Sequence, residues 1–143
     1  TTMEKYTQIG EEFYDLERRR KTYDDRWPFK ENCACTPEQM AIAGFLHQPS
    51  DLELDAVICF FCFKELDGWE QDDVPLIEHK KHSSDCGFLT RKKEFEDLTV
   101  QEFISLETER QKNLLKKVIS TKKTEFLHQA DAVRRQLEQL HDL

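Results

Sequence analysis

Four residues follow the spacing C-x2-C-x16-H-x6-C along the chain: Cys59, Cys62, His79 and Cys86. They offer three thiolates and one imidazole in two close pairs, which is the ligand set of a tetrahedral Zn²⁺ site. Because protein groups fill all four positions, none is left for an activated water, and we expect one structural zinc ion. The alternative is a set of reduced core cysteines with a surface histidine. The second pair at this spacing favours the metal.

The other two cysteines, Cys33 and Cys35, are separated by one residue, and such pairs rarely bridge each other. We expect both to be small packing residues. No apolar segment follows a basic start at the N-terminus, so neither a secretory signal nor a disulfide framework is expected.

The chain is acidic, with 21 Lys and Arg against 29 Asp and Glu and a formal charge of −8. Direct binding to a nucleic-acid backbone is therefore not expected, and a basic partner is favoured. The sequence has no run of 18 apolar residues, which argues against a membrane span. A short basic run at 18–21 is interpreted as a solvated helix end.

Glycine and proline, the residues that interrupt helices, all lie before residue 88. Residues 1–98 carry 13 basic and 22 acidic side chains, whereas 99–143 carry 8 and 7. This division predicts a turn-rich acidic module followed by a long helix. We expect four parts in chain order: an N-terminal segment at 1–16, a zinc domain at 17–90, a linker and junction at 91–98, and the helix at 99–143.

Cap and turn residues predict short elements within the module. Thr36 is expected to cap a helix, with Pro37 in its first turn and Gln39 completing a capping box. Met40, Ala41, Ala43 and Phe45 supply the apolar residues of this helix, and Gly44 is expected to end it. Thr36-Pro37 also has the form of a proline-directed kinase site, so Thr36 is a candidate phosphosite. The next predicted elements are a strand at 56–63, a loop at 65–78 and a short helix at 79–86.

Thr99 and Glu102 form the pattern of a second capping box, which starts the final predicted helix. A helix over 99–141 would be about 64 Å long, so most of it is expected to project from the module. It carries an apolar seam near heptad spacing: Leu115, Val118, Ile119, Phe126, Ala130, Val133, Leu137 and Leu140. Such a seam is expected to pack against partner helices, and self-association is the alternative.

Leu66 and Trp69 lie among the carboxylates of the acidic segment 65–78, which contains no Lys or Arg. An indole beside paired carboxylates suits a ligand with an ammonium and a small apolar group, such as a free protein N-terminus that begins with Ala. Lys64 and His82 flank the acids and are suited to an anion such as phosphate. A solvated acidic loop is the alternative.

The junction before the long helix is apolar at four positions: Phe95, Leu98, Val100 and Phe103. These side chains either attach the helix to the module or form an interface with a second chain.

Six motifs together resemble one known family: Trp27-Pro28-Phe29, CACTP at 33–37, Ala43-Gly44-Phe45, CFFC at 59–62, Gly68-Trp69 and HKKHSSDC at 79–86. They are similar to the baculovirus inhibitor-of-apoptosis repeat, and the single repeat running into a long helix resembles one group of that family. The resemblance implies an α+β fold: a small zinc-cross-linked module with a three-stranded antiparallel sheet and short helices, then a long C-terminal α-helix. Asp24 stands where the family has an aromatic residue, and Tyr23 is displaced by one position, so the first helix is expected to pack differently.

The resemblance also implies a ligand for the acidic segment, namely an N-terminal histone tail, Ala-Arg-Thr, with the threonine phosphorylated. Seven positions match the family's tail-binding residues: Asp67 and Asp73 for the amine, Leu66 and Trp69 for the alanine methyl, Glu65 for the arginine, and Lys64 and His82 for the phosphate.

For the long helix, the resemblance implies a three-helix bundle with borealin and the inner centromere protein, which connects the chain indirectly to Aurora B kinase in the chromosomal passenger complex. It implies a homodimer through the four junction residues when these partners are absent. It places such a protein in the nucleus and cytoplasm, and in mitosis at the centromere, the kinetochore and the spindle midzone.

The closed metal site, with no nucleophile–base pair and no glycine-rich phosphate loop in the sequence, argues against an enzyme. Together with this, the resemblance implies that the chain is a non-enzymatic mitotic adaptor. The alternative is an inhibitor of apoptosis that acts on caspases or captures the N-terminus of a mitochondrial antagonist.

Overall fold

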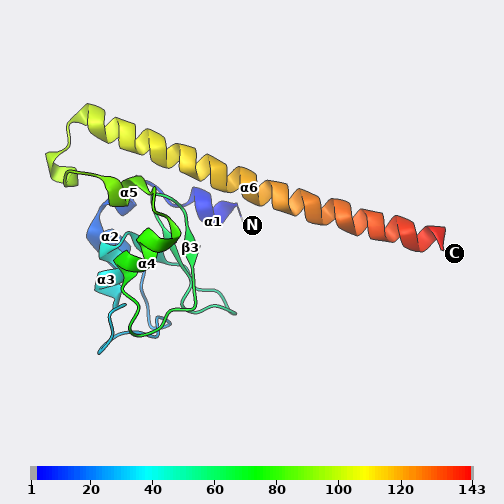
Figure 1. Ribbon diagram of the computed structural model, residues 1–143, viewed down its shortest axis with the longest axis horizontal. Coiled ribbons are helices and arrows are strands. Elements are labelled where there is room, and N and C mark those ends of the chain that lie inside the picture. Colours follow the sequence, from blue (N-terminus) through cyan, green and yellow to red (C-terminus); the bar gives the residue numbers. More distant parts are fainter. Residues whose placement is uncertain (1–2, 143) are drawn as a thin grey trace.

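The structure is a computed structural model that describes residues 3–142, and it places a small mixed module beside one long helix (Figure 1). Its elements in chain order are α1 (Glu4–Thr7), η1 (Glu11–Tyr14), α2 (Leu16–Arg20), α3 (Pro37–Ile42), β1 (Phe45–His47), β2 (Val57–Cys59), β3 (Glu65–Leu66), α4 (Pro75–His82), α5 (Gly87–Thr90), η2 (Phe95–Asp97) and α6 (Val100–His141). The predicted α+β class is confirmed, with its three-stranded antiparallel sheet, short helices and long C-terminal helix.

The sheet joins its strands in the order β1-β2-β3, and both pairs are antiparallel. Phe45 of β1 lies opposite Cys59 of β2, and Val57 of β2 lies opposite Leu66 of β3. Every residue of β1 and β2 is buried, so both faces of these strands are covered. β3 is an edge strand, and its two residues are half-buried.

Aromatic side chains fill the core around the sheet. Trp27, Phe45, Phe60, Phe61 and Phe63 are each fully buried. Burial of one large apolar side chain contributes about 1.5–3 kcal/mol, so these rings supply a large part of the stability of a thin core.

The strand prediction is wrong at both ends of β2. The strand expected at 56–63 forms only at Val57–Cys59, because the chain then turns, with Phe63 in the left-handed region at φ 61°, and brings Cys62 back beside Cys59. Glu65–Leu66, expected as loop, is β3, because it pairs with β2 across this turn. A two-residue strand carries too little pattern to be recognised in the sequence.

The helix capped by Thr36 is α3, but it ends at Ile42, and Phe45 belongs to β1 instead. Gly44 follows the C-cap residue Ala43 and ends the helix as predicted, because its φ is +96° and a Cβ at this position would lie 2.9 Å from the Phe88 ring. The left-handed conformation stops the helix, and the absence of a side chain lets the Phe88 ring pack closely.

The predicted bounds of the next helix, 79–86, are also corrected. α4 spans Pro75–His82, because Pro75 occupies its first turn, where the fixed φ of proline favours a helix start. The chain then forms the separate short helix α5.

The basic run at 18–21 is not wholly solvated, contrary to its interpretation from the sequence. Arg19 is 3 % exposed. Its guanidinium donates to the carbonyls of Ala41 and Phe13 at 2.8 Å and to that of Tyr14 at 3.1 Å. Burial lowers the pKa of Arg19 to about 10. The side chain thus connects η1, α2 and α3 from inside the module.

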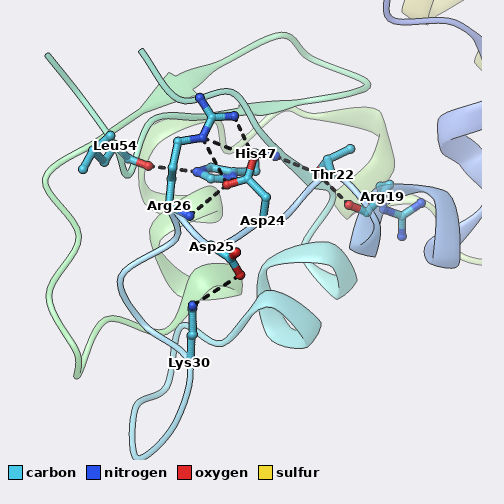
Figure 2. A network of polar contacts seen from close by, with 8 residues as sticks. All are labelled: Arg19, Thr22, Asp24, Asp25, Arg26, Lys30, His47 and Leu54. Atoms are coloured by element: carbon cyan, nitrogen blue, oxygen red, sulfur yellow. Dashed lines mark hydrogen bonds and ion pairs between the residues drawn. The ribbon is translucent and has the colours of Figure 1, made fainter. Parts of the chain in front are cut away.

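The unusual N-terminal pattern around Asp24 leaves the aromatic core intact. Tyr23 is 8 % exposed, stacks on His47 with ring centroids 5.2 Å apart, and donates from its hydroxyl to the Phe45 carbonyl at 3.0 Å. Asp24 pairs with Arg26 at 2.6 Å, and its carboxylate lies 3.9 Å from Nδ1 of the same His47 (Figure 2). The extra residue before Trp27 is therefore absorbed in a surface turn.

α6 begins with the predicted capping box, in which Thr99 Oγ1 accepts the N–H of Glu102 and Glu102 Oε1 accepts the N–H of Thr99, both at 3.1 Å. The helix has 42 residues, about 63 Å. Its first half lies along the module, and Leu106, Leu114 and Val118 pack against the core (Figure 1). Residues 122–142, here called the distal helix, are almost all exposed and extend past the module.

The N-terminal segment attaches α6 to the module. Arg110 is 1 % exposed, donates to the Ile9 carbonyl at 2.9 Å and pairs with Glu107 at 2.8 Å. Tyr14 donates from its hydroxyl to the same Glu107 carboxylate at 2.9 Å. None of the helices in the described range combines the length and the apolar character needed to cross a membrane.

Candidate metal centre and peptide groove

The four predicted metal ligands meet in one cluster: Cys59, Cys62, His79 and Cys86. Their ligand atoms all lie within 4.8 Å of one another. Cys59 Sγ is 4.0 Å from Cys86 Sγ, and Cys62 Sγ is 3.5 Å from His79 Nε2. Three of the residues are buried and Cys62 is half-buried, so the cluster is nearly closed to solvent.

Local backbone structure points the ligands inward. Cys59 ends β2, and the N–H groups of Phe61 and Cys62 both donate to its sulfur at 3.4 Å. This tight turn, residues 59–63, is called the knuckle below. His79 comes from α4, and Cys86 immediately precedes α5. A bound ion would therefore cross-link the sheet to two helices.

Neighbouring polar groups prepare two of the ligands. His79 Nδ1 lies 2.7 Å from the Ala43 carbonyl, so Nδ1 donates to it and the Nε2 lone pair faces the cysteines. Ser83 donates from its hydroxyl to Cys62 Sγ at 3.3 Å. The donor set and these supporting bonds fit a structural Zn²⁺.

The thiols of the cluster differ in acidity. Hydrogen bonds from the Cys59 and Cys86 thiols lower the pKa of Cys62, whereas burial raises the pKa of Cys59 well above its usual value. Zinc binds thiolates, so it must displace the proton of Cys59. Metal affinity is therefore expected to fall as the pH falls.

Cys33 and Cys35 lie outside the cluster. Cys35 is buried and Cys33 half-buried, and all five cysteines are free thiols. The packing role expected for Cys35 is consistent with its place in the core.

Five of the predicted tail-binding residues line one groove of about 170 Å³: Leu66, Asp67, Trp69, Asp73 and His82. Gly68 and Glu78 complete its lining. The prediction missed Glu78, whose carboxylate lies 3.5 Å from His82 Nε2. Its position one helical turn before His82 was the available signal, because residues at i and i+4 share a helix face.

Hydrogen bonds to two aspartates, one before β2 and one in the loop after β3, hold the groove in shape. The Trp69 N–H donates to Asp55 Oδ2 at 2.8 Å, and the Glu70 N–H donates to Asp73 Oδ2 at 2.9 Å. Gly68 allows the turn between strand and groove, since its φ is +71°. The acidic side chains are thus presented by an ordered loop.

The groove contains carboxylates and an indole that are available to a ligand. Asp67, Asp73 and Glu78 give it three carboxylates, whose field favours a cation. Trp69 is 7 % exposed, and its indole Nε1 has no hydrogen-bond partner within residues 3–142. The groove therefore combines negative charge with an aromatic wall, which suits a cationic ligand.

The other two predicted tail-binding residues lie outside this groove. Lys64 lines a separate hollow between the knuckle and α6. Glu65 pairs with Lys5 at 2.8 Å and Lys117 at 3.4 Å, and it accepts from the Tyr6 hydroxyl at 3.2 Å. Burial acts to raise the pKa of Glu65, but these partners outweigh it and the pKa is lowered.

Two of the four predicted dimer residues are used within the chain. Phe95 and Phe103 pack against Tyr14, with ring centroids 5.1 and 5.0 Å from it. Leu98 is half-buried, and Val100 is 77 % exposed. The two phenylalanines therefore attach the helix to the module, which is one of the two roles predicted for this cluster.

Seven of the eight predicted seam residues are exposed: Leu115, Ile119, Phe126, Ala130, Val133, Leu137 and Leu140. Val118 instead packs against the module core. Phe126 is 68 % exposed, an unusual state for a phenylalanine. Most of the seam is thus available on the distal helix.

The candidate phosphosite Thr36 is half-buried at the start of α3. Its Oγ1 accepts the N–H of Gln39 at 3.3 Å, which is one of the two bonds of the predicted capping box. The hydroxyl thus has a structural role.

Comparison with known proteins adds a family to this geometry. The profile of the inhibitor of apoptosis domain matches residues 19–90. The chain is 53 % identical over 129 residues to Baculoviral IAP repeat-containing protein 5 of Cavia porcellus, covering 90 % of each chain. It is 55 % identical over 114 residues to the protein of that name in Mus musculus, covering 80 % of this chain and 81 % of the relative. Among solved structures it is similar to DIAP1 BIR1 bound to a Grim peptide, at 30 % identity and a TM-score of 0.47, covering 67 % of this chain and 90 % of the other.

Proposed function

This chain belongs to the baculoviral inhibitor-of-apoptosis repeat family and is similar to the survivin group within it, and on that premise we propose that it is a non-enzymatic adaptor of the mitotic chromosomal passenger complex. The acidic groove binds the phosphothreonine-bearing N-terminal tail of a histone. The seam of α6 binds borealin and the inner centromere protein, and through them Aurora B kinase indirectly. Such an adaptor works in the nucleus and cytoplasm, and in mitosis at the centromere, the kinetochore and the spindle midzone.

One observation carries the proposal: three carboxylates, an indole and the Leu66 side chain converge in a single groove. Asp67 and Asp73 are suited to a terminal ammonium, and the apolar surface of Leu66 and Trp69 to the methyl of a first alanine. His82, whose side chain is 42 % exposed at the rim, is suited to the phosphate.

The position of β3 supports binding of an extended tail. Its outer edge belongs to no strand pair among the described residues, so a peptide can add to it by main-chain hydrogen bonds. Leu66 belongs both to β3 and to the groove lining. A tail anchored by its amine in the groove can therefore continue along the strand.

The metal cluster supports the groove rather than a reaction. Cys59 and Cys62 lie at the end of β2, while His79 lies on α4 between the groove residues Glu78 and His82. When bound, Zn²⁺ supplies the cross-link between these elements. Since protein side chains fill all four positions, the role proposed for this centre is structural, and the chain is proposed not to be an enzyme.

The distal helix supports the second half of the proposal. A row of exposed apolar residues on an otherwise polar, projecting helix requires a partner for stability in water. Two partner helices can cover such a row in a three-helix bundle. In their absence, Leu98 and Val100 are accessible to a second copy, and a homodimer is proposed for the free chain.

The groove chemistry also favours the alternative function, an inhibitor of apoptosis. An ammonium and a first alanine are features of any exposed N-terminus that begins with Ala, including that of a mitochondrial antagonist. Phosphate recognition separates the two functions, because only the histone tail carries it. Direct inhibition of caspases is a separate test of the alternative.

Calorimetry with three peptides tests the groove: the phosphorylated tail, the unmodified tail and the phosphorylated tail with an acetylated amine. We expect acetylation to weaken binding about 100-fold or more, because it removes the ammonium that faces the carboxylates of the groove. Asp73→Asn keeps the bond to the Glu70 N–H and removes the charge, so it should weaken binding about tenfold. Asp72→Asn, on an exposed neighbour outside the groove, is the matched control.

His82→Ala tests the phosphate contact and should weaken binding of the phosphorylated tail more than that of the unmodified tail. Equal losses for the two tails would contradict the phosphate role of His82. Unchanged binding of the acetylated tail would contradict the groove assignment as a whole. A caspase-inhibition assay on the same protein decides the alternative, which requires inhibition at stoichiometric concentrations.

A further inference from the structure

We propose that a pocket between α3, α4, α5 and linker residues 91–94 binds the loop that joins β1 to β2 in a second copy of this chain. The pocket measures about 270 Å³ and is called the basic pocket below. Aliphatic side chains of Ile42, Leu76 and Leu89 line it, together with four cations and one carboxylate. Neither the metal centre nor the acidic groove uses these residues.

The apolar surface of the basic pocket is accessible. Ile42 at the end of α3 is 48 % exposed, and Leu76 on α4 is 42 % exposed. Leu76 and Lys80 stand at i and i+4, so they share one face of α4. An aliphatic side chain from another molecule can therefore contact Ile42 and Leu76 while a neighbouring carboxylate reaches Lys80.

Positive charge predominates in the basic pocket. Its one carboxylate, Glu94, lies 3.6 Å from Arg91, and Lys93 forms an ion pair with α6 at 3.2 Å. The ammonium groups of Lys80 and Lys92 make neither a hydrogen bond nor an ion pair among residues 3–142. Two lysines are thus free for the carboxylates of a ligand, in a chain whose net charge is −8.

The β1–β2 loop, residues 48–56, has the complementary composition. It contains three acidic residues and no Lys, Arg or His. Leu52 in its centre is 92 % exposed, and Leu54 is 49 % exposed. Asp51 and Glu53, on either side of Leu52, are exposed as well. A leucine between two carboxylates matches an aliphatic surface between two free lysines.

Hydrogen bonds hold the β1–β2 loop in shape. The Ser50 N–H donates to the Glu53 carbonyl at 3.0 Å, and the Glu53 N–H donates to Ser50 Oγ at 3.1 Å. His47 Nε2 lies 2.8 Å from the Leu54 carbonyl and joins the loop to the buried end of β1 (Figure 2). An ordered loop loses less conformational entropy on binding than a flexible one.

The loop and the pocket do not meet within one chain, because Leu52, Ile42 and Leu76 are all exposed. The complementary loop is therefore that of a second copy. Because the two surfaces differ, the contact is heterologous, and each copy can bind one neighbour through its pocket and another through its loop. Leu98 and Val100, proposed above for the homodimer, are not among the pocket residues, so this contact is additional to that dimer. So small a contact is expected to be weak, with a dissociation constant on the order of 100 µM.

Sedimentation equilibrium of the zinc-loaded full chain, between about 10 and 500 µM, tests the contact by exchanging its charges. One variant reverses the pocket (Lys80→Glu, Lys92→Glu), and a second reverses the loop (Asp51→Lys, Glu53→Lys). We expect the average mass of the wild type to rise throughout this range and each variant alone to associate about tenfold more weakly, since like charges then face each other. An equimolar mixture of the two variants should regain wild-type association, because every pocket then meets a loop of opposite charge.

The control Lys21→Glu, Lys112→Glu makes the same change in net charge as the pocket variant, at exposed positions outside both surfaces. It should associate like the wild type. Leu52→Ser tests the apolar part of the contact and should weaken association about tenfold, while zinc content stays at one ion per chain because the side chain is exposed.

A mixture that associates no better than its components would overturn the proposal, as would equal weakening in the Lys21→Glu, Lys112→Glu control. A wild-type mass that levels off at that of a dimer, or wild-type association of Leu52→Ser, would also overturn it. Lys80 follows the metal ligand His79, so zinc is measured in every variant. If the pocket variant loses zinc, the loop variant and Leu52→Ser, changed only at exposed loop positions, decide the proposal.

Discussion

The module and the distal helix bury their apolar residues in opposite ways. In the module, the aromatic rings around the sheet are fully buried, and four ligand atoms gather within 4.8 Å. On the distal helix, Phe126 is 68 % and Leu140 65 % exposed. The module buries its aromatic residues within its own chain, whereas the apolar side of the distal helix is left exposed.

The difference teaches where each kind of recognition resides. The module presents a formed groove on an ordered loop, so it can bind a small, disordered peptide without rearranging. The distal helix offers a long exposed apolar row, and under the proposed function its specificity depends on partner helices that match the spacing of this row. A chain built this way can connect two partners that do not contact each other.

Metal removal should produce the largest effect and should break the module alone. Structural zinc sites contribute on the order of 10 kcal/mol to folding, so chelation or Cys62→Ser should abolish the packed core. Fluorescence of the buried Trp27 and Trp69 should shift to the red, while NMR signals from 122–142 stay in place. At fixed chelator concentration the loss should increase as the pH falls, since protons compete for Cys59, whose pKa burial raises.

Cys33→Ser is the matched control for metal removal, because Cys33 is half-buried and outside the cluster. It should retain one zinc per chain by elemental analysis. A folded module in the metal-free Cys62→Ser protein would show that the aromatic core suffices without the cross-link.

A smaller effect is expected from Arg19→Met, which keeps the apolar stem and removes the donors to three carbonyls. The free energy of unfolding of the module should fall by about 3 kcal/mol, measured by urea denaturation. Arg18→Met, one residue earlier and exposed, should change it by less than about 0.5 kcal/mol. Similar losses for both variants would mean that charge, rather than the buried bonds, stabilises this corner.

The metal ligands could be predicted from sequence because the chemistry of a tetrahedral site restricts both residue type and spacing. The start of α6 could be predicted because a capping box is local, with both bonds made between Thr99 and Glu102. The absence of glycine and proline after residue 88 then predicted its length. In each case the prediction rests on residues that are close in the sequence or on the ligand requirements of one metal ion.

Other features depend on residues that are distant in the sequence. Nothing in the local sequence separates Arg19 from Arg18, since the packing of η1 and α3 around α2 selects which arginine is buried. Glu65 and Lys64 were grouped with the groove by position, but Lys117, more than fifty residues later, pairs with Glu65 and lines the hollow with Lys64. These assignments required knowing where α6 lies against the module.

The central claim is that the groove and the distal helix bind different partners independently, and a crossed binding measurement tests it most directly. Phe126→Glu removes the most exposed aromatic of the seam, and Asp73→Asn removes a groove charge. His128→Glu, on the opposite face of α6, controls for the added charge. Each protein is titrated with the phosphorylated tail and, separately, with the borealin and inner centromere protein helices.

We predict that Phe126→Glu weakens binding of the helices about 100-fold or more and leaves tail affinity unchanged. Asp73→Asn should weaken tail binding about tenfold and leave binding of the helices unchanged. His128→Glu should behave like the wild type in both titrations. Loss of both interactions in either single variant, with zinc content and fold intact, would contradict the two-part account.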